Sequence, residues 1–251
     1  YIRIIQVEDP GYTAMEKMRK QASDLYDTLK HNGHETILLV DVSNRGKLVK
    51  AFLEGLILNH YQFLKYKHPD PDQKNTLQDI QVLSHGISED DLRMLEALCT
   101  AVYYARDLVN EPFSHQNALQ LGKQFQKLAA ESGFSIEVFN KKKIESLKLN
   151  GLLAVNRGSV DPPSFSVMEW KPDQPRNKKP VILIGKGIVY DTGGISLKPT
   201  SHMLDMKSDM AGGATVAGIM YAMAKLQLPV HLIAMVPATD NRPDGNAYTP
   251  G

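Results

Sequence analysis

The 251-residue sequence lacks several features that define common protein classes. Cys99 is its only cysteine, so no intramolecular disulfide can form and a reducing compartment is favoured. No apolar run approaches the ~18 residues needed to span a bilayer, and the opening segment YIRIIQVEDP is too short and too charged for a signal peptide. We therefore expect a cytoplasmic protein with no membrane partner.

An excess of charge of one sign is also missing. The 29 Lys and Arg residues nearly balance the 28 Asp and Glu residues, which leaves a formal net charge of +1. Such a balance gives no support to a nucleic-acid partner and favours a small neutral or mixed-charge substrate. The sequence contains neither phosphate-binding glycine motif, GxxxxGK[ST] or GxGxxG, and the HExxH motif of thermolysin-like zinc enzymes is absent too.

The chain is long enough for two domains, and its apolar patterns alternate between strand and helix periods. Strands are expected at 2–7, 36–42, 80–83, 135–139, 164–170, 181–184 and 230–236. Helices are expected at 12–30, 46–66, 117–132, 141–147 and 211–226, with a further helix from the acidic residues after Ser88 to about Asn110. This order predicts an α/β protein: a small N-terminal α/β domain at 1–87, then a larger α/β domain at 88–251 with a mostly parallel mixed sheet.

Residues 181–218 carry lysines and aspartates among seven glycines. A buried parallel strand normally reads as a continuous apolar run, so Lys186, between Gly185 and Gly187, is out of place in one. In an extended strand, Lys186 and Asp191 would lie roughly 16 Å apart on opposite faces, at about 3.3 Å per residue. They can converge only if the chain bends, which the glycines allow.

Two interpretations of these side chains remain open from spacing alone. Lys186, Asp191 and Asp209 can be metal ligands, although a lysine amine must be neutral to offer a lone pair, a form that a nearby cation favours. Lys198 would then stabilise a developing oxyanion. Alternatively, Asp209 caps the helix that follows it, Asp191 is an ordinary turn aspartate, and both lysines reach solvent.

The run GKGIVYDTGGISLKP, followed by MLDMKSDMAGGAT, resembles the signature of the leucine aminopeptidase family of metallopeptidases. The segments ARDLVNEP and NRPDGNAYTPG resemble the same family, in the same order and at similar spacing. The resemblance extends from about residue 95 to the carboxyl end and, more loosely, over the first domain. It implies that the first domain is similar to macro domains and serves assembly and regulation, and that the second domain is catalytic.

The resemblance also implies roles for individual residues. Lys186 and Asp209 match the ligands of the tighter metal, and Asp191 matches a ligand that bridges two metals. Lys198 matches the catalytic lysine, and Met206 matches a methionine that lines the pocket for the substrate's first side chain. The implied activity is two-metal release of N-terminal, leucine-like residues from peptides or amino-acid amides, with Zn, Mn or Mg, by a homo-hexamer.

Some of the family's pattern is different or missing. His202, Leu204 and Ala211 depart from the usual residues of the loop and of the helix start. The NTDAEGR motif, which supplies a further aspartate and glutamate ligand and an arginine that helps to hold a bicarbonate base, does not occur. We therefore expect an incomplete catalytic domain, a two-metal site that these 251 residues cannot complete alone, and bicarbonate only in the intact enzyme.

Two other functions fit parts of the sequence. Asp191-Thr192-Gly193 matches the active-site triplet of aspartic proteases, but that fold is mainly β and needs a second triplet or a symmetric dimer. A non-catalytic binding or assembly module derived from the aminopeptidase family is the other alternative. The codons beyond Gly251 discriminate, because an NTDAEGR-like sequence there favours the enzyme and a stop codon favours the module.

Overall fold

The computed structural model describes residues 11–68, 74–243 and 246–250. The strand expected at 2–7 lies outside the described residues. Contacts within the chain divide it into two compact units, 1–100 and 101–251. The boundary expected from the sequence precedes helix α3 (Glu89–Asn110), whereas the contacts divide the chain within that helix.

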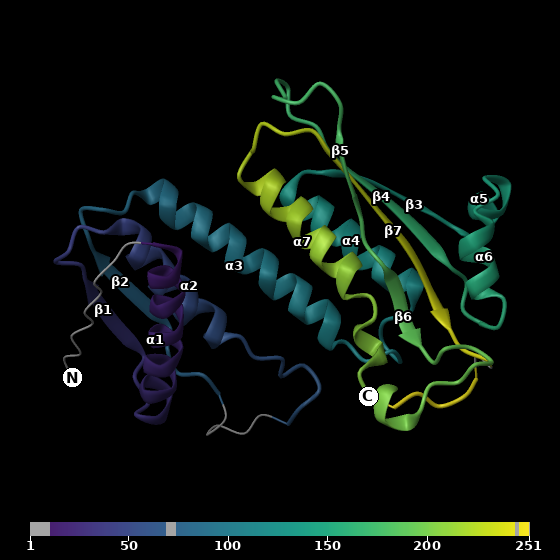
Figure 1. Cartoon of the computed structure of the whole chain (residues 1–251), viewed down its shortest axis with the longest axis horizontal. Helices are drawn as coiled ribbons and strands as arrows, with labels where there is room; N and C mark the ends of the chain where they lie inside the picture. The colour runs from purple at the N-terminus through teal and green to yellow at the C-terminus, as the bar shows by residue number, and fades with distance from the viewer. Residues whose placement is uncertain (1–10, 69–73, 244–245, 251) are drawn as a thin grey trace. The chain divides into compact units, whose positions relative to one another are not determined.

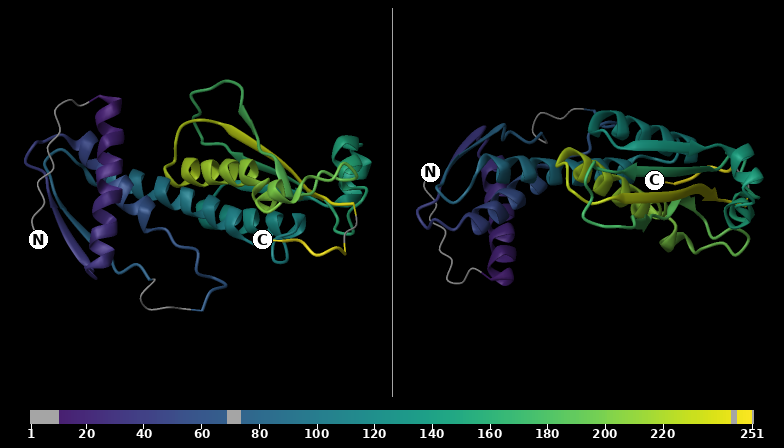
Figure 2. Two further views of the ribbon diagram at one scale, coloured as in Figure 1. Left: turned by 60° about the horizontal axis from the view of Figure 1, so that its bottom comes forward. Right: turned by 90° about the horizontal axis from the view of Figure 1, so that it is seen from above.

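The first unit packs two helices on one face of a two-stranded parallel sheet (Figures 1 and 2). Its elements are α1 (Tyr12–His31), β1 (Thr36–Val40), α2 (Gly46–His60), β2 (Asp79–Leu83) and the first half of α3. β1 and β2 are joined through α2, the crossover that a parallel pair requires. Met18, Tyr26 and Phe52 of the helices are buried against Ile37 and Ile80 of the strands.

Helix α2 ends at His60, six residues before the end that its apolar pattern predicts. Tyr61 leaves the helical region with φ −57° and ψ 131°. The side-chain amide of Asn75 donates a hydrogen bond to the His60 carbonyl, and the Tyr26 hydroxyl lies 2.9 Å from His60 Nδ1. Contacts from distant segments therefore fix the end of α2. The local apolar pattern of the helix carries no information about these contacts.

The second unit is an α/β layer structure built on a five-stranded mixed sheet (Figure 1). Its helices are the rest of α3, α4 (Ala118–Ser132), α5 (Lys141–Ser146), α6 (Asn150–Asn156) and α7 (Ala211–Lys225), with short 3-10 turns η2 (Thr200–His202) and η3 (Met206–Ser208). Its strands are β3 (Ser135–Phe139), β4 (Ser164–Trp170), β5 (Val181–Ile184), β6 (Gly187–Asp191) and β7 (Leu232–Asn241). The predicted α/β class with a mixed sheet is confirmed.

Strand β7 is the hub of this sheet. It pairs antiparallel with β4 on one side and parallel with both β5 and β6 on the other, while β3 pairs antiparallel with β4. The sheet therefore holds as many antiparallel as parallel pairings, where the sequence predicts mostly parallel ones. β7 also runs to Asn241, beyond the predicted end at residue 236, because partners on both sides continue past that point.

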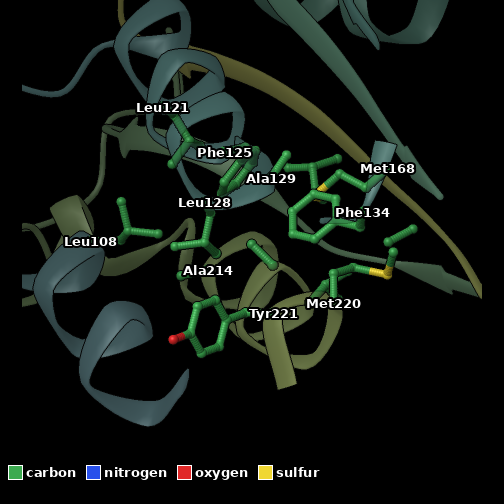
Figure 3. Packing of buried hydrophobic residues seen from close by; sticks show 14 of the residues in the cluster. Leu108, Leu121, Phe125, Leu128, Ala129, Phe134, Met168, Ala214, Met220 and Tyr221 are labelled. Atoms are coloured by element: carbon green, nitrogen blue, oxygen red, sulfur yellow. The ribbon is translucent and has the colours of Figure 1, made fainter. Parts of the chain in front are cut away.

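Helices α4 and α7 pack against each other and against the same face of β4 and β7 (Figures 1 and 2). β4 alternates strictly between buried and half-buried residues, which places one of its faces under these helices. Figure 3 shows Leu121, Phe125 and Leu128 of α4 in one cluster with Met168 of β4 and Tyr221 of α7. Within the described ranges, no helix combines the length and the apolar character needed to cross a bilayer.

The start of α3 makes stability depend on pH. Asp91 accepts hydrogen bonds from the main-chain N–H and the hydroxyl of Ser88, and Ser88 Oγ accepts one from Asp91 N–H. Lys50 Nζ lies 2.6 Å from Asp91 Oδ1. The hydrogen bond from Lys50, together with those from Ser88, lowers the pKa of Asp91 to about 2.

The low pKa predicts how Asp91→Asn will behave. Because the carboxylate is favoured in the folded state, its stabilisation is complete above the unfolded pKa of about 3.9 and is lost as the pH falls towards 2. The urea midpoint of Asp91→Asn should therefore lie below that of the wild type at pH 6, with the gap closing between about pH 4 and pH 2. Asp90→Asn, at an exposed position, is the control; a gap that persists at pH 2 would contradict the assignment.

Phe125 tests the core of the second unit. It is fully buried, so Phe125→Ala should lower the free energy of unfolding by about 3–5 kcal/mol, through lost burial and the cavity left behind. Leu119→Ala on the same helix removes a side chain that is 36% exposed and should cost much less. Denaturant unfolding of both variants measures the difference, and similar losses would contradict the placement of Phe125, and not Leu119, in the core.

Candidate metal site

The site begins where β5 passes into β6. Val181 pairs with Leu232 and Gly187 with Ala238, both 51 positions apart, so β5 and β6 follow one line along β7 with a break at residues 185 and 186. The carbonyls of His231, just before β7, and of Met235 accept hydrogen bonds from Val181 N–H and Gly185 N–H, so alternate residues along this stretch direct their main-chain groups to β5. Pro237 is the next in that alternation and has no N–H to offer. The ladder between β7 and the neighbouring line therefore lacks one hydrogen bond at this break.

The start of α7 fills the break. Gly213 N–H donates to the Lys186 carbonyl at 2.8 Å. The two chains approach so closely that a Cβ on Gly185 would lie 2.6 Å from the Gly213 Cα. Only glycine permits this contact. The packing fixes Lys186 beside the start of α7, close to Asp209 just ahead of that helix.

Lys186 and Asp209 form an ion pair at this junction. Lys186 Nζ lies 2.8 Å from Oδ1 and 2.6 Å from Oδ2 of Asp209. The Lys186 side chain is 57% exposed and that of Asp209 is 19% exposed. Asp209 Oδ2 is shielded from solvent, and among the described residues its close polar neighbour is the lysine nitrogen, which does not point a hydrogen bond at it. A buried carboxylate oxygen with this spare capacity suits a cation.

Asp209 does not cap α7. The N-cap position is Met210, and no side chain makes a capping hydrogen bond there. Asp209 instead ends the short turn η3, which packs against β6. The interpretation of Asp209 as a plain helix cap is wrong, because the 3-10 turn directs its carboxylate to Lys186 and not to the amides of α7.

Asp191 and Lys198 form a second, more enclosed pair. Lys198 Nζ lies 2.5 Å from Asp191 Oδ2 and 3.2 Å from the Asp191 carbonyl oxygen. It also lies 3.0 Å from the sulfur of Met206. The lysine side chain is 28% exposed, so Lys198 is not a freely solvated loop charge. The structure thus brings Lys198, Asp191 and Met206 together.

The Asp191 carboxylate has several hydrogen-bond donors. Oδ1 accepts from Gly193 N–H at 3.0 Å and from Asn241 Nδ2 at 2.7 Å. Burial raises the pKa of Asp191, but the hydrogen bonds from Lys198, Gly193 and Asn241 outweigh it and hold the pKa below its usual value. The contact with Gly193 is that of a turn aspartate, so the turn interpretation is correct as geometry and compatible with a ligand role.

The chain bends between Lys186 and Asp191, as convergence requires. Ile188 pairs with Thr239 and Asp191 with Asn241, so β6 advances three residues where β7 advances two, and β6 contains one extra residue. One extra residue reverses the alternation of faces, which allows residues five apart to share a face. The turn after β6 then needs positive φ at Gly193 (89°) and Gly194 (71°).

The donor set is small. In the part of the chain that the structure describes, no group of three or more His, Cys, Asp and Glu side chains is placed to hold a metal ion. The candidate ligands are two aspartates and one lysine, and lysine is not among those four residue types. Carboxylate oxygens suit Zn, Mn and Mg alike, and an amine suits Zn and Mn better than Mg. These residues therefore fit part of a metal site.

A buried ion pair lies behind this site and was not anticipated from the sequence. Arg242 Nε donates to Asp240 Oδ2 at 2.6 Å, and the two side chains are only 4% and 1% exposed. Arg242 also reaches Asp161 Oδ2 at 3.3 Å. Its guanidinium lies 4.2 Å from the Phe113 ring, which meets Tyr190 edge-on. The available signal was a pair of opposite charges two positions apart at the end of an apolar run.

The same region decides the relationship to known proteins. Residues 103–251 match the catalytic domain of the cytosol aminopeptidase family. The chain belongs to the cytosol aminopeptidase family. This confirms the resemblance drawn from the motifs around Lys186, Asp191 and Asp209.

Relatives in the cytosol aminopeptidase family match the whole of this chain or a large part of it. A probable cytosol aminopeptidase from Aquifex aeolicus is 35% identical over 254 residues, which cover 100% of this chain and 51% of the relative. One from Chloroherpeton thalassium is 50% identical over 156 residues, 62% of this chain and 30% of the relative. The chain thus spans about half the length, or less, of these curated relatives.

A solved structure supports the same relationship. The bottromycin maturation enzyme BotP in complex with Mn superposes with a TM-score of 0.80 at 29% sequence identity. The superposition covers 93% of this chain and 49% of BotP. The fold of both units therefore occurs within a larger protein.

The Asp240 and Arg242 pair yields a stability prediction. Arg242→Met leaves the buried Asp240 carboxylate without its partner and should lower the free energy of unfolding by about 3–5 kcal/mol. The double variant Asp240→Leu with Arg242→Met leaves neither charge unpaired at this pair and should cost less than the sum of the single changes. Denaturant unfolding of the single and double variants measures the coupling; strictly additive losses would mean that the two charges do not interact.

Proposed function

We propose that this chain carries part of the active site of a metal-dependent aminopeptidase. The enzyme would release N-terminal residues, leucine-like ones preferred, from peptides or amino-acid amides by two-metal hydrolysis. The observation that carries the proposal is the close approach of Lys186 Nζ to both carboxylate oxygens of Asp209 at the break in the sheet. Membership of the cytosol aminopeptidase family supports the reaction class.

In this proposal Lys186 and Asp209 bind the tighter metal. The 2.6 Å and 2.8 Å contacts place the lysine nitrogen and both carboxylate oxygens within one small volume. A lysine that is 57% exposed can exchange its proton with solvent before it acts as a neutral ligand. The spare capacity of Asp209 Oδ2 would then be used by the cation.

Asp191 would bridge the two metals. Its Oδ1 is held by two donors and its Oδ2 faces Lys198, so the carboxylate presents both oxygens in fixed directions. The lowered pKa keeps Asp191 ionised at neutral pH, which ligation requires. When bound, two divalent ions would polarise the scissile carbonyl and lower the pKa of a water that attacks it.

Lys198 would stabilise negative charge on the substrate carbonyl oxygen. It is held by the carbonyl and carboxylate oxygens of Asp191, so its position is fixed before substrate arrives. Met206 touches Lys198 through its sulfur and would line the pocket for the first side chain of the substrate. A flexible thioether suits a leucine-like group.

Three ligand side chains are few for two metals, since zinc alone usually takes four ligands. We therefore expect the second metal to need carboxylates beyond Lys186, Asp191 and Asp209, and this chain alone to have little activity. Bicarbonate as a base, a homo-hexamer and a cytoplasmic location belong to the proposal for the intact enzyme. The relatives' name, cytosol aminopeptidase, supports the location.

Metal titration tests the proposal. Mn²⁺ or Zn²⁺ added to the chain in a calorimeter should bind at one site, and Lys186→Met or Asp209→Asn should weaken that binding at least tenfold by removing a ligand. Lys225→Met and Asp205→Asn are matched controls at positions outside the proposed site, and they should bind as the wild type does. In the intact protein, the same two ligand variants should lose hydrolysis of leucine p-nitroanilide.

Other outcomes would count against this assignment. Equal metal affinity in wild type and both ligand variants would remove Lys186 and Asp209 from the site. Binding without hydrolysis in the intact protein would favour the non-catalytic module. Chelator-resistant, pepstatin-sensitive peptidase activity would revive the aspartic protease alternative.

A further inference from the structure

Asn241 lies at the end of β7, directly opposite Asp191 in the register of β6 and β7. Its side-chain Nδ2 donates to Asp191 Oδ1 at 2.7 Å. This is the only side-chain amide that the described residues place on that carboxylate. The contact joins the hub of the sheet to the residue proposed to bridge two metals.

The backbone of Asn241 is itself held in place. Its main-chain carbonyl accepts from both the N–H and the hydroxyl of Thr192, at 3.0 Å and 2.8 Å. Its side-chain oxygen faces Gly194, where an added Cβ would lie only 3.1 Å away. Because the Asp191 carboxylate can only accept, the amide nitrogen points to it, and the amide oxygen takes the space that Gly194 leaves open.

The hydrogen bonds divide the two oxygens of Asp191 between different tasks. Asn241 and Gly193 both donate to Oδ1, whereas Lys198 donates to Oδ2. Gly193 is in the same turn as Asp191 and follows any movement of that turn. Asn241 comes from a different strand, so it is the contact that fixes the rotation of the carboxylate relative to the sheet.

We propose that Asn241 is a positioning residue that sets the orientation of the Asp191 carboxylate for metal binding. This inference rests on the proposed function, because it assumes that Asp191 is a ligand. Without the amide, Asp191 keeps its turn contact and its ion pair with Lys198 but can rotate about its side-chain bonds. The expected consequence is weaker metal binding in a protein that remains folded. Partners of metal ligands typically affect metal affinity 10–100-fold.

Two substitutions of Asn241 test the role in the intact protein. Asn241→Ala removes the donor, and Asn241→Asp keeps the shape but places an acceptor against Asp191 Oδ1. Calorimetry with Mn²⁺ should show affinity at one site reduced about 10-fold in Asn241→Ala and about 100-fold in Asn241→Asp. With leucine p-nitroanilide at saturating Mn²⁺, kcat should fall while KM changes less than threefold.

Asn177→Asp is the matched control. Asn177 is also held by hydrogen bonds, from its amide to the carbonyls of Lys179 and His231, but it lies on the loop between β4 and β5. It should lower the thermal midpoint without changing Mn²⁺ affinity. Asn241→Ser, with a small hydroxyl donor, serves as a milder variant if Asn241→Ala does not fold, and it should keep more affinity than Asn241→Asp.

The outcomes separate this inference from the function it rests on. If the wild type binds no Mn²⁺, the proposed function fails and the inference fails with it. If the wild type binds Mn²⁺ and the Asn241 variants bind equally well, only the positioning role is overturned. The positioning role would also be overturned if Asn177→Asp, at the same thermal midpoint as the Asn241 variants, lost as much Mn²⁺ affinity as they do. Equal losses would reflect general destabilisation.

Discussion

The arrangement of the site depends on one interrupted ladder of hydrogen bonds. β5 and β6 lie in line along β7, and Pro237 cannot donate to the position between them. At the same break, the Lys186 carbonyl accepts a hydrogen bond from Gly213 N–H, which holds the start of α7 against the strand with glycine against glycine. A regular strand would place Lys186 among its apolar neighbours. The break allows a charged side chain on the outer strand line of the described sheet to face a carboxylate from another element.

Charge is distributed unevenly around this break. The Lys186 pair is open to solvent on the lysine side, whereas Lys198 and Asp191 are more enclosed, and Arg242 with Asp240 is almost fully buried. Buried charges of this kind add little net stability but strongly penalise any arrangement that separates them. The Arg242 pair therefore restricts the end of β7 to one conformation. That restriction reaches Asp191 through the neighbouring Asn241 and through Phe113, which packs on Tyr190.

Local patterns in the sequence predict much of the fold. The bounds of β3, β4 and β5 agree with their apolar runs, and α3 begins at its acidic residues and ends at Asn110, as expected. The misses come from contacts between distant segments. Helix α6 and strand β6 were not expected, α2 stops where Asn75 and Tyr26 hold it, and β7 continues through Pro237 because its neighbours do. The family motifs identify Lys186, Asp191, Lys198, Met206 and Asp209 as candidates, and their roles remain predictions. Asn241 and Arg242 open the segment NRPDGNAYTPG that resembles the family, but the motif assigns them no role, since their contacts depend on strand register.

Strand β7 also has a mechanical consequence for the site. Both β5 and β6 pair with β7, so the strand segments that flank Lys186 and the residue Asp191 are positioned by the same strand. A small tilt or slide of β7 would carry the two together and leave their separation unchanged. Motion of α7 acts differently, because Gly213 holds the Lys186 carbonyl and Asp209 lies just ahead of that helix. Strand β7 thus preserves the spacing along its own line, whereas the placement of Asp209 depends on the helix.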